Sequence, residues 1–171
     1  MMPTSVGILM RIREAVESDL PGIVDIYNKG IESHTASTNT RPTTVNRSLG
    51  WFRQHKAAGK PIIVAEDSGR VVGWLSIRPF YRRPAYDATA KVIVYVSPES
   101  RRKGVGRELL RKALEKSSSS GVSKLVGYIL SINEPARKLL ESSGFQKWGS
   151  FPGAANIDGA EHDVVVMGRK V

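Results

Sequence analysis

Apolar residues fall into two patterns along the chain, and each pattern predicts its own kind of element. Short apolar or alternating runs predict strands, whereas apolar residues that recur every three or four positions predict helices. Strands are predicted at residues 11–15, 61–66, 70–78, 92–96, 124–130, 147–151 and 163–167. Helices are predicted over residues 20–31, from Thr43 or Thr44 to Lys56, from Gly104 to a loop at the serine run 117–120, and from Asn133 to just before Gly144. The order is strand, two helices, three strands, helix, strand, helix and two strands.

The stretch 92–110 is the most informative part of this pattern. Its five apolar, mostly β-branched residues at 92–96 predict a buried strand, and a basic turn with Gly104 and Gly106 leads directly into a helix. The first N–H groups of a helix lack internal partners and carry partial positive charge, and glycines let a phosphate approach the backbone. Full positive charges surround this turn on Arg101, Arg102, Lys103 and Arg107. The segment therefore predicts an anion-binding strand-turn-helix suited to a pyrophosphate.

Two other phosphate-binding loops are excluded by their spacing. The GxxxxGK[ST] pattern occurs nowhere in the chain, and a GxGxxG pattern that starts at Gly104 requires glycine where Leu109 stands. The sequence therefore indicates neither an ATPase nor a Rossmann dehydrogenase.

The basic turn resembles the coenzyme A loop of the GNAT superfamily of N-acetyltransferases. Residues 101–106, Arg-Arg-Lys-Gly-Val-Gly, match every specified position of the pattern Arg/Gln-x-x-Gly-x-Gly/Ala that opens the third helix in that family. A second match, NEPARKLLESSGF at residues 133–145, is similar to the family's Asn-x-x-Ala helix with its following Gly-Phe. The resemblance implies that Asn133 lies near the pantetheine arm, although a helix N-cap explains this residue equally well. It implies acetyl-CoA-binding roles for Val94, Tyr95, Val96, Arg101, Arg102, Lys103, Gly104, Val105, Gly106, Arg107 and Asn133.

The resemblance extends from about residue 10 to the last residue of the sequence. It implies an α/β (α+β) GNAT fold, with a mixed central sheet of about seven strands flanked by about four helices. We expect residues 10–171 to form a single acetyl-CoA-dependent N-acetyltransferase domain, and residues 1–9 to form a flexible N-terminal extension. The apolar runs are too short to span a membrane and no secretion signal is seen, so a cytoplasmic protein is expected.

The composition limits the chemistry and the partners of the chain. The sequence contains no cysteine, which excludes disulfides, thiolate metal sites and a cysteine nucleophile, so acetyl transfer is expected to be direct. Backbone N–H groups of residues 94–96, exposed by a strand splay or bulge, are expected to polarise the thioester carbonyl. No metal is expected, because His34 and His55 lack ligand partners at useful spacing.

The net charge of +10 raises the alternative of nucleic acid binding. No zinc-finger spacing, RNP-type motif or long basic helix accompanies this charge. An anionic cofactor and an acidic substrate explain the charge more economically, and nucleic acid binding is not expected.

Four further motifs resemble the phosphinothricin and methionine-sulfoximine acetyltransferases within this superfamily. They are Asp25-Ile26-Tyr27-Asn28, Ala85-Tyr86-x-x-Thr89, Val94-Tyr95-Val96 and His162-Asp163-Val164. Such enzymes acetylate the α-amino group of glutamate-like compounds, which implies that the acceptor is a small amine, preferably an amino acid or a related analogue. Arg78 and Tyr86, with Arg82 and Arg83 nearby, are candidates to bind an acidic group of the acceptor. Related enzymes often dimerise, so a homodimer is expected.

The chain departs from this group at two positions that matter for proton transfer. Lys91 stands where similar proteins carry a glutamate, and Leu140 stands where a tyrosine or histidine is common. Positioned acid and base groups contribute about 10²- to 10⁴-fold, so their loss slows transfer without excluding it. Lys91 with a depressed pKa, or His162, is the candidate catalytic group that removes the proton of the acceptor.

Other roles stay open for these residues. Lys91 is equally suited to bind an acceptor carboxylate while water removes the proton, or to pair with Glu66 or Asp87. A single histidine such as His162 is more often a structural hydrogen-bonding group. The changes at Lys91 and Leu140 also motivate a different function, a catalytically impaired acyl-CoA-binding module with a regulatory role. Acetylation of a protein N-terminus or a polyamine is a third alternative, although a polyamine favours an acidic cleft.

Overall fold

The computed structural model describes residues 10–171. These residues form one seven-stranded sheet with the strand order β1-β2-β3-β4-β5-β7-β6. The strands are β1 (Arg11–Glu14), β2 (Ile62–Asp67), β3 (Arg70–Pro79), β4 (Thr89–Val96), β5 (Lys124–Leu130), β6 (Gln146–Ile157) and β7 (Ala160–Lys170). The helices are α1 (Leu20–Glu32), α2 (Val45–Ala57), α3 (Val105–Ser119) and α4 (Glu134–Ser142), with short 3₁₀ turns η1 (Glu17–Asp19), η2 (Pro84–Tyr86) and η3 (Pro98–Ser100). This element order confirms the architecture predicted from the sequence.

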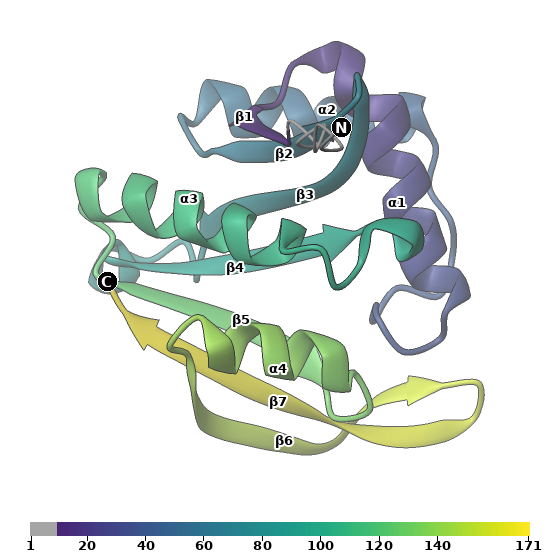
Figure 1. The fold of residues 1–171 in the computed structure, drawn as a ribbon. Helices are drawn as coiled ribbons and strands as arrows, with labels where there is room; N and C mark the ends of the chain where they lie inside the picture. Colours follow the sequence, from purple (N-terminus) through teal and green to yellow (C-terminus); the bar gives the residue numbers. More distant parts are fainter. Residues whose placement is uncertain (1–9) are drawn as a thin grey trace, which may run out of the picture.

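Neighbouring strands are antiparallel except for β4 and β5, which run parallel and make the sheet mixed. These two strands pair only between residues 89–91 and residues 124–126. Beyond that point β4 stays paired with β3, while β5 follows β7. Figure 1 shows the two strands side by side at one end and separating toward the other. The sheet is therefore split into two parts along a V-shaped opening.

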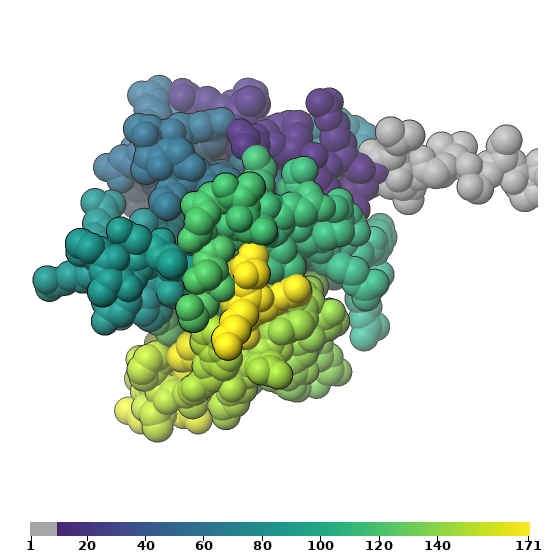
Figure 2. All heavy atoms as spheres, turned by 90° about the vertical axis from the view of Figure 1, so that its left-hand side faces the viewer, coloured from purple at the N-terminus to yellow at the C-terminus, as the bar shows by residue number. Residues whose placement is uncertain are grey.

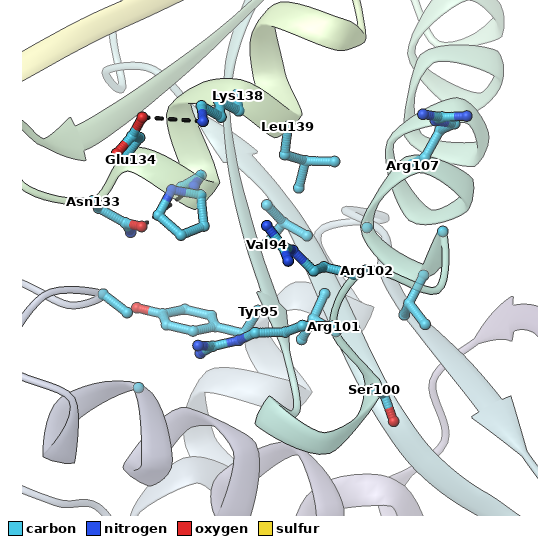
Figure 3. Close-up of a pocket in the computed structure, with 18 of the residues that line it drawn as sticks. Val94, Tyr95, Ser100, Arg101, Arg102, Arg107, Asn133, Glu134, Lys138 and Leu139 are labelled. Atoms are coloured by element: carbon cyan, nitrogen blue, oxygen red, sulfur yellow. Dashed lines mark hydrogen bonds and ion pairs between the residues drawn. The ribbon is translucent and has the colours of Figure 1, made fainter.

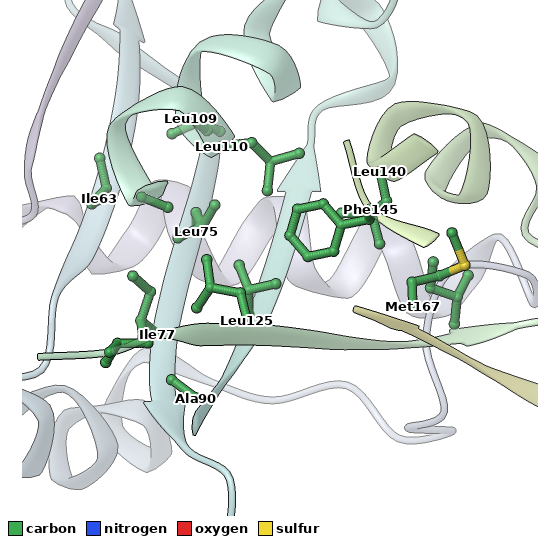
Figure 4. Packing of buried hydrophobic residues seen from close by; sticks show 14 of the residues in the cluster. Ile63, Leu75, Ile77, Ala90, Leu109, Leu110, Leu125, Leu140, Phe145 and Met167 are labelled. Atoms are coloured by element: carbon green, nitrogen blue, oxygen red, sulfur yellow. The ribbon is translucent and has the colours of Figure 1, made fainter. Parts of the chain in front are cut away.

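Helices cover both faces of the sheet, and each face has its own apolar core. On one face, Leu109 of α3 and Leu140 of α4 pack with strand residues such as Met167 (Figure 4). On the other face, α1 and α2 cover β1 to β4 through a second cluster. Successive side chains of a strand point to opposite faces, which is why Val92 belongs to the first core and Ile93 packs against the second.

Several boundaries predicted from the sequence are wrong, and the strand predicted at residues 92–96 begins at Thr89. The serine run does not form a loop, because α3 continues through Ser119. Ser117 is 1% exposed, so its small side chain fits against the core, and the hydroxyls of Ser119 and Ser120 donate to carbonyls one turn earlier. The last two strands are longer than predicted, because β6 and β7 continue into a hairpin closed by a turn at residues 158–159.

The predicted N-terminal extension, residues 1–9, lies outside the described residues. At the other end, the Val171 N–H donates to the Ser123 carbonyl at 2.9 Å, and Figure 2 shows the end of β7 on the surface beside the helices that follow β4 and β5. Within residues 10–171 no helix combines the length and the apolar character needed to cross a membrane.

Candidate active site

A cavity of about 710 Å³ opens where β4 separates from β5. It is lined by the end of β4, the turn before α3, the first turn of α3 and the start of α4, and it reaches α1 on the other face of the sheet. All of the predicted acetyl-CoA-binding residues except Lys103 line this cavity. Figure 3 shows Asn133 and Glu134 across the cavity from Tyr95 and Arg101. The fold therefore brings the two motifs of the sequence to one place.

The edge of β4 that faces the cavity has no strand partner in residues 10–171 over most of its length. On its other edge, the Ser97 N–H donates to the Val72 carbonyl of β3 at 2.9 Å. Backbone groups alternate sides along a strand, so the N–H groups of Val94 and Val96 point away from β3 and toward the cavity. The Tyr95 N–H points toward β3. Of the three N–H groups predicted to polarise the thioester carbonyl, only those of Val94 and Val96 therefore point toward the cavity.

The N-terminus of α3 faces the same cavity with unpaired donors. Its N-cap is Gly104 at φ 82°, a left-handed conformation that favours glycine, and no side chain of the described residues caps the helix. The first intrahelical hydrogen bond runs from the Glu108 N–H to the Gly104 carbonyl at 3.1 Å. The N–H groups of Val105, Gly106 and Arg107 are therefore left for an external acceptor. Together with Arg107, they give this end of the cavity a helix terminus of the kind that suits an anion.

The turn before α3 brings two predicted arginines to the cavity and directs a lysine elsewhere. Arg101 and Arg102 line the cavity, whereas Lys103 does not. Arg102 adopts φ 62°, in a region that is uncommon for residues other than glycine. Left-handed backbone at residues other than glycine is found most often in functional sites. The conformation of Arg102 and the two arginines at the cavity therefore both point to a binding turn.

The start of α4 closes the cavity from the opposite side. The Asn133 side-chain oxygen accepts a hydrogen bond from the Ala136 N–H at 3.3 Å, so this residue caps α4 and lines the cavity at once. α4 packs closely on α3, because a Cβ added at Gly106 meets the Leu139 Cδ2 atom at 2.7 Å. Leu140 is buried in the core and does not line the cavity.

Lys91 lies outside this cavity, among aromatic rings on the face of the sheet that α1 and α2 cover. Its Nζ atom lies 4.9 Å from the Tyr81 ring centroid, 5.0 Å from that of Tyr128 and 5.7 Å from that of Phe80. These distances are within the range of cation–π attraction. Burial, and then the positive charge of Arg78, lower the pKa of Lys91.

The predicted alternative of an ion pair between Lys91 and Glu66 or Asp87 is not found in the described residues. Glu66 instead accepts a hydrogen bond from Arg13 Nε at 2.8 Å. The charge of Lys91 is therefore left without a carboxylate partner within residues 10–171.

The fold does not bring His162 to Lys91. His162 pairs with Ala155 in the β6–β7 hairpin and precedes Gly168 by six residues. Gly168 pairs with Val126 of β5, which in turn pairs with Lys91. Six residues of strand span about 20 Å, so the two predicted catalytic residues cannot act together on one proton. Within residues 10–171 no three His, Asp or Glu side chains group closely enough to hold a metal ion.

The two predicted acceptor-binding residues also lie apart. Tyr86 is 44% exposed and lines a second cavity of about 360 Å³ beside η2. Arg78 lines neither cavity; it stands opposite Lys91 in the β3–β4 register. Phe80 lies between Tyr86 and the Arg78–Lys91 pair. Its ring centroid is 5.5 Å from that of Tyr86 and 5.7 Å from Lys91 Nζ.

The structure adds three residues with buried polar atoms that the sequence did not reveal, His55, Trp74 and Ser76, to the predicted candidate Arg78. Trp74, Ser76 and Arg78 alternate along β3 and therefore share the face that carries Lys91. The Trp74 Nε1, Ser76 Oγ and Arg78 Nε atoms are buried without a hydrogen-bond partner among the described residues, as is His55 Nε2 of α2. The sequence does show polar residues at alternate positions of an apolar strand, and this pattern could have marked them as candidates. Only the β3–β4 register shows that they lie beside Lys91.

A family model identifies the class to which this fold and site belong. The model of the Acetyltransferase (GNAT) family matches residues 23–145, which include the loop before α3 and the start of α4. The chain therefore belongs to the acetyltransferase (GNAT) family. This confirms the predicted fold and the predicted enzyme class, an acetyl-CoA-dependent acyltransferase.

Individual relatives narrow the comparison further. YwnH of Bacillus subtilis strain 168, whose name assigns it provisionally as a phosphinothricin acetyltransferase, is 40% identical over 163 residues, covering 95% of this chain and 99% of its own. The L-methionine sulfoximine/L-methionine sulfone acetyltransferase of Pseudomonas aeruginosa strain PAO1 is 32% identical over 157 residues, 91% of each chain. A crystal structure of a Sinorhizobium meliloti phosphinothricin acetyltransferase with acetyl-CoA matches with a TM-score of 0.90 at 26% identity, covering 95% of this chain and 88% of its own.

Proposed function

We propose that the chain transfers the acetyl group of acetyl-CoA to the amino group of a small amine, preferably an amino acid or an analogue such as phosphinothricin or methionine sulfoximine. The names of its relatives support this choice of acceptor. The observation that carries the proposal is the one cavity that joins the N-terminus of α3 to the unpaired edge of β4. The helix terminus suits a pyrophosphate, and the strand edge suits a thioester carbonyl.

The cavity residues divide into a phosphate end and a thioester end. In this proposal the pyrophosphate of acetyl-CoA accepts hydrogen bonds from the N–H groups of residues 105–107, beside the guanidinium groups of Arg101 and Arg102. The pantetheine arm follows the free edge of β4 and passes Asn133. The thioester carbonyl then lies at the N–H groups of Val94 and Val96, which polarise it.

Acetyl transfer is direct, because the sequence has no cysteine to carry an intermediate. The neutral amine attacks the thioester carbonyl carbon, forming a C–N bond as the C–S bond breaks. The ammonium proton leaves to water, and the released thiolate takes up a proton from water. A thiol pKa near 8.5 makes the thiolate an adequate leaving group, so the absence of a titratable side chain at Leu140 costs little.

Two measurements test the proposal. The first follows CoA release from acetyl-CoA over a panel of amino acids and small amines. The second compares acetyl-CoA affinity in Gly104→Glu and Gly69→Glu, two variants with the same added charge and similar strain, since φ is 82° and 77° and an added Cβ meets no atom within 4 Å at either site. We expect at least about a tenfold loss of affinity for Gly104→Glu only, because its carboxylate repels the phosphates. Equal affinities in the two variants would show that the coenzyme loop has been assigned wrongly.

The alternative of a catalytically impaired acyl-CoA-binding module is favoured by one observation, the lysine at position 91. In this alternative the cavity still binds acetyl-CoA through its phosphate end, but the protein does not transfer the acetyl group. Tight acetyl-CoA binding with no CoA release for any acceptor in the panel would favour the module over the enzyme.

A further inference from the structure

The side chain of Tyr95 borders the cavity between the two N–H groups that are proposed to polarise the thioester. Tyr95 stands between Val94 and Val96 in β4, and all three residues line the cavity. The Tyr95 side chain packs with the apolar cluster beneath α1 and α2, whereas the side chains of Val94 and Val96 pack with the cluster on the other face of the sheet. A thioester placed at these N–H groups is therefore bounded by Tyr95 on the α1 face.

The Tyr95 ring is held in place from several sides. Its centroid lies 5.1 Å from that of Trp74 in a stacked pair and 5.5 Å from that of Tyr27 in an edge-to-face pair. Such pairs are favourable beyond the area that they bury. The ring also lies against the backbone of α1, because a Cβ added at Gly30 would lie 2.9 Å from the Tyr95 Cε1 atom. Tyr95 therefore cannot move toward α1 to make room for a larger ligand.

Small residues complete this end of the cavity. Gly30 of α1 and Ala36, in the segment after α1, both line it. A Cβ placed at Gly30 would lie 3.9 Å from the Cβ of Ala36, which is ordinary van der Waals contact. Tyr95, Gly30 and Ala36 thus form one closely packed surface, the acyl wall.

The acyl wall lies opposite the phosphate end of the cavity. The helix terminus that suits the pyrophosphate belongs to α3, whereas the acyl wall includes α1 on the other face of the sheet. The acyl group is at the opposite end of the coenzyme from the pyrophosphate. A coenzyme bound with its phosphates at α3 therefore directs its acyl group toward the acyl wall.

We propose that the acyl wall limits the donor to short acyl groups, and that Tyr95 selects acetyl-CoA over longer acyl-CoA thioesters. This inference rests on the proposed acetyl transfer, and it concerns the donor instead of the acceptor amine. With every donor the C–N bond forms as the C–S bond breaks and CoA is released, so only the room for the acyl chain differs. Extra methylenes pressed against a closely packed surface force neighbouring side chains out of their preferred positions, which is unfavourable.

Acetyl-CoA, propanoyl-CoA and butanoyl-CoA are the probes, with the most rapidly acetylated amine of the panel as the acceptor. One methylene in an apolar pocket changes kcat/KM by about 10- to 200-fold. Butanoyl-CoA carries two more methylenes than acetyl-CoA. In the wild type we therefore expect kcat/KM for acetyl-CoA to exceed that for butanoyl-CoA by at least about 100-fold.

Three variants test whether the Tyr95 ring sets this preference. Tyr95→Leu opens the acyl wall and should reduce the preference for acetyl-CoA over butanoyl-CoA by at least about tenfold. Tyr95→Phe keeps the ring without the hydroxyl and should retain the preference. Tyr27→Leu is the matched control, because Tyr27 packs against Tyr95 but does not line the cavity, so the preference should again be retained.

Ala36→Val tests the same wall in the opposite direction and does not depend on the folding of Tyr95→Leu. Ala36 lies outside the helices and strands and is only partly buried, so the segment can carry a larger side chain. The added methyl groups should narrow the acyl end of the cavity. We expect the preference for acetyl-CoA over propanoyl-CoA to rise by about tenfold, the lower end of the effect of one methylene.

Equal kcat/KM for acetyl-CoA and butanoyl-CoA in the wild type would overturn the inference. So would an unchanged preference in folded Tyr95→Leu, or a loss in Tyr95→Phe or Tyr27→Leu as large as that in Tyr95→Leu. If Tyr95→Leu does not fold, an unchanged preference in Ala36→Val refutes the inference and the expected rise supports it.

A separate measurement decides the inference if no amine is acylated and the proposed transfer fails. Calorimetric titration then compares the affinities of acetyl-CoA and butanoyl-CoA in the wild type and in Tyr95→Leu. A preference for acetyl-CoA that disappears in Tyr95→Leu supports the inference. Equal affinities of the two thioesters in the wild type refute it.

Discussion

At the scale of single residues, Asn133 combines two roles that substitutions can separate. Its side chain caps α4, and the same residue lines the cavity that we propose binds acetyl-CoA. Asn133→Ala removes both the cap and the amide, and we expect it to lower the free energy of unfolding by about 1 kcal/mol. Asn133→Ser keeps a capping oxygen, so its stability should stay close to that of the wild type. Both variants should raise KM for acetyl-CoA.

Thermal unfolding and acetyl-CoA titration of the two variants provide the check. The informative result is the serine variant, in which stability is restored and KM is not. If Asn133→Ser restores both the stability and the KM for acetyl-CoA, the role of Asn133 is limited to capping α4.

That the residues around the N-terminus of α3 line the cavity could be predicted from the sequence because their signal is local. Gly104, Gly106 and the arginines around them are neighbours in the sequence, and one helix N-terminus fixes their geometry. The acceptor side has no such local signal. Arg78 and Lys91 meet only through the β3–β4 register, and the sequence alone does not specify which residue of one strand faces which residue of the other.

At the scale of elements, one arginine ties β1, η1 and β2 together. Arg13 donates to both carboxylate oxygens of Asp19, at 2.7 and 2.9 Å, and from Nε to Glu66 at 2.8 Å. Burial by itself raises the pKa of Asp19, but hydrogen bonds from Arg13 and from the Val16 N–H outweigh burial and bring the pKa below its usual value. The pair therefore stabilises the fold above the unfolded pKa of about 3.9 and loses this effect as pH falls through the folded pKa.

Asp19→Asn should remove this pH-dependent stabilisation. We expect it to lower the free energy of unfolding at pH 7 by about 1–3 kcal/mol, the range for a hydrogen bond to a charged group, because Asp19 is 7% exposed. The difference from the wild type should shrink at an acidic pH well below the unfolded pKa of about 3.9, as Asp19 becomes protonated in the folded state as well. Glu17→Gln is the control, since its exposed pair with Arg53 is weakened by solvent and should matter little. Urea unfolding at both pH values measures the effect; a difference that is independent of pH would contradict it.

The order of elements could be predicted from caps and apolar periods, and the errors have identifiable causes. Serine favours loops, but Ser117 fits the core where a larger side chain would not, so α3 continues. In β6 the pairing register shifts between Phe151 and Ala155, around Pro152 and Gly153. Pro152 and Gly153 interrupt the alternation of apolar residues, so the sequence pattern ends the strand at Phe151. The second half of β6 could not be predicted because it is defined by its pairing with β7.

At the scale of the whole molecule, the helices leave one part of the sheet uncovered. α1 and α2 cover β1 to β4, and the same face of β5, β7 and β6 carries exposed aromatic residues. Tyr128, Trp148 and Phe151 are 37%, 44% and 50% exposed, and the ring centroids of Tyr128 and Phe151 lie 6.1 Å apart. Adjacent exposed aromatic rings of this kind are typical of protein association surfaces.

We propose that two copies of the chain associate through this aromatic surface, since a twofold interface places the same patch against itself. Light scattering after size exclusion should give the mass of a dimer for the wild type. Phe151→Asp should shift it toward the monomer, because an unpaired carboxylate is costly in an apolar contact. Val16→Asp is the matched control: Val16 is also 50% exposed but follows β1 at the opposite edge of the sheet, so the dimer should persist. A monomeric wild type would show that the chain does not form this dimer. A dimer that persists in Phe151→Asp would show that the two copies associate through another surface.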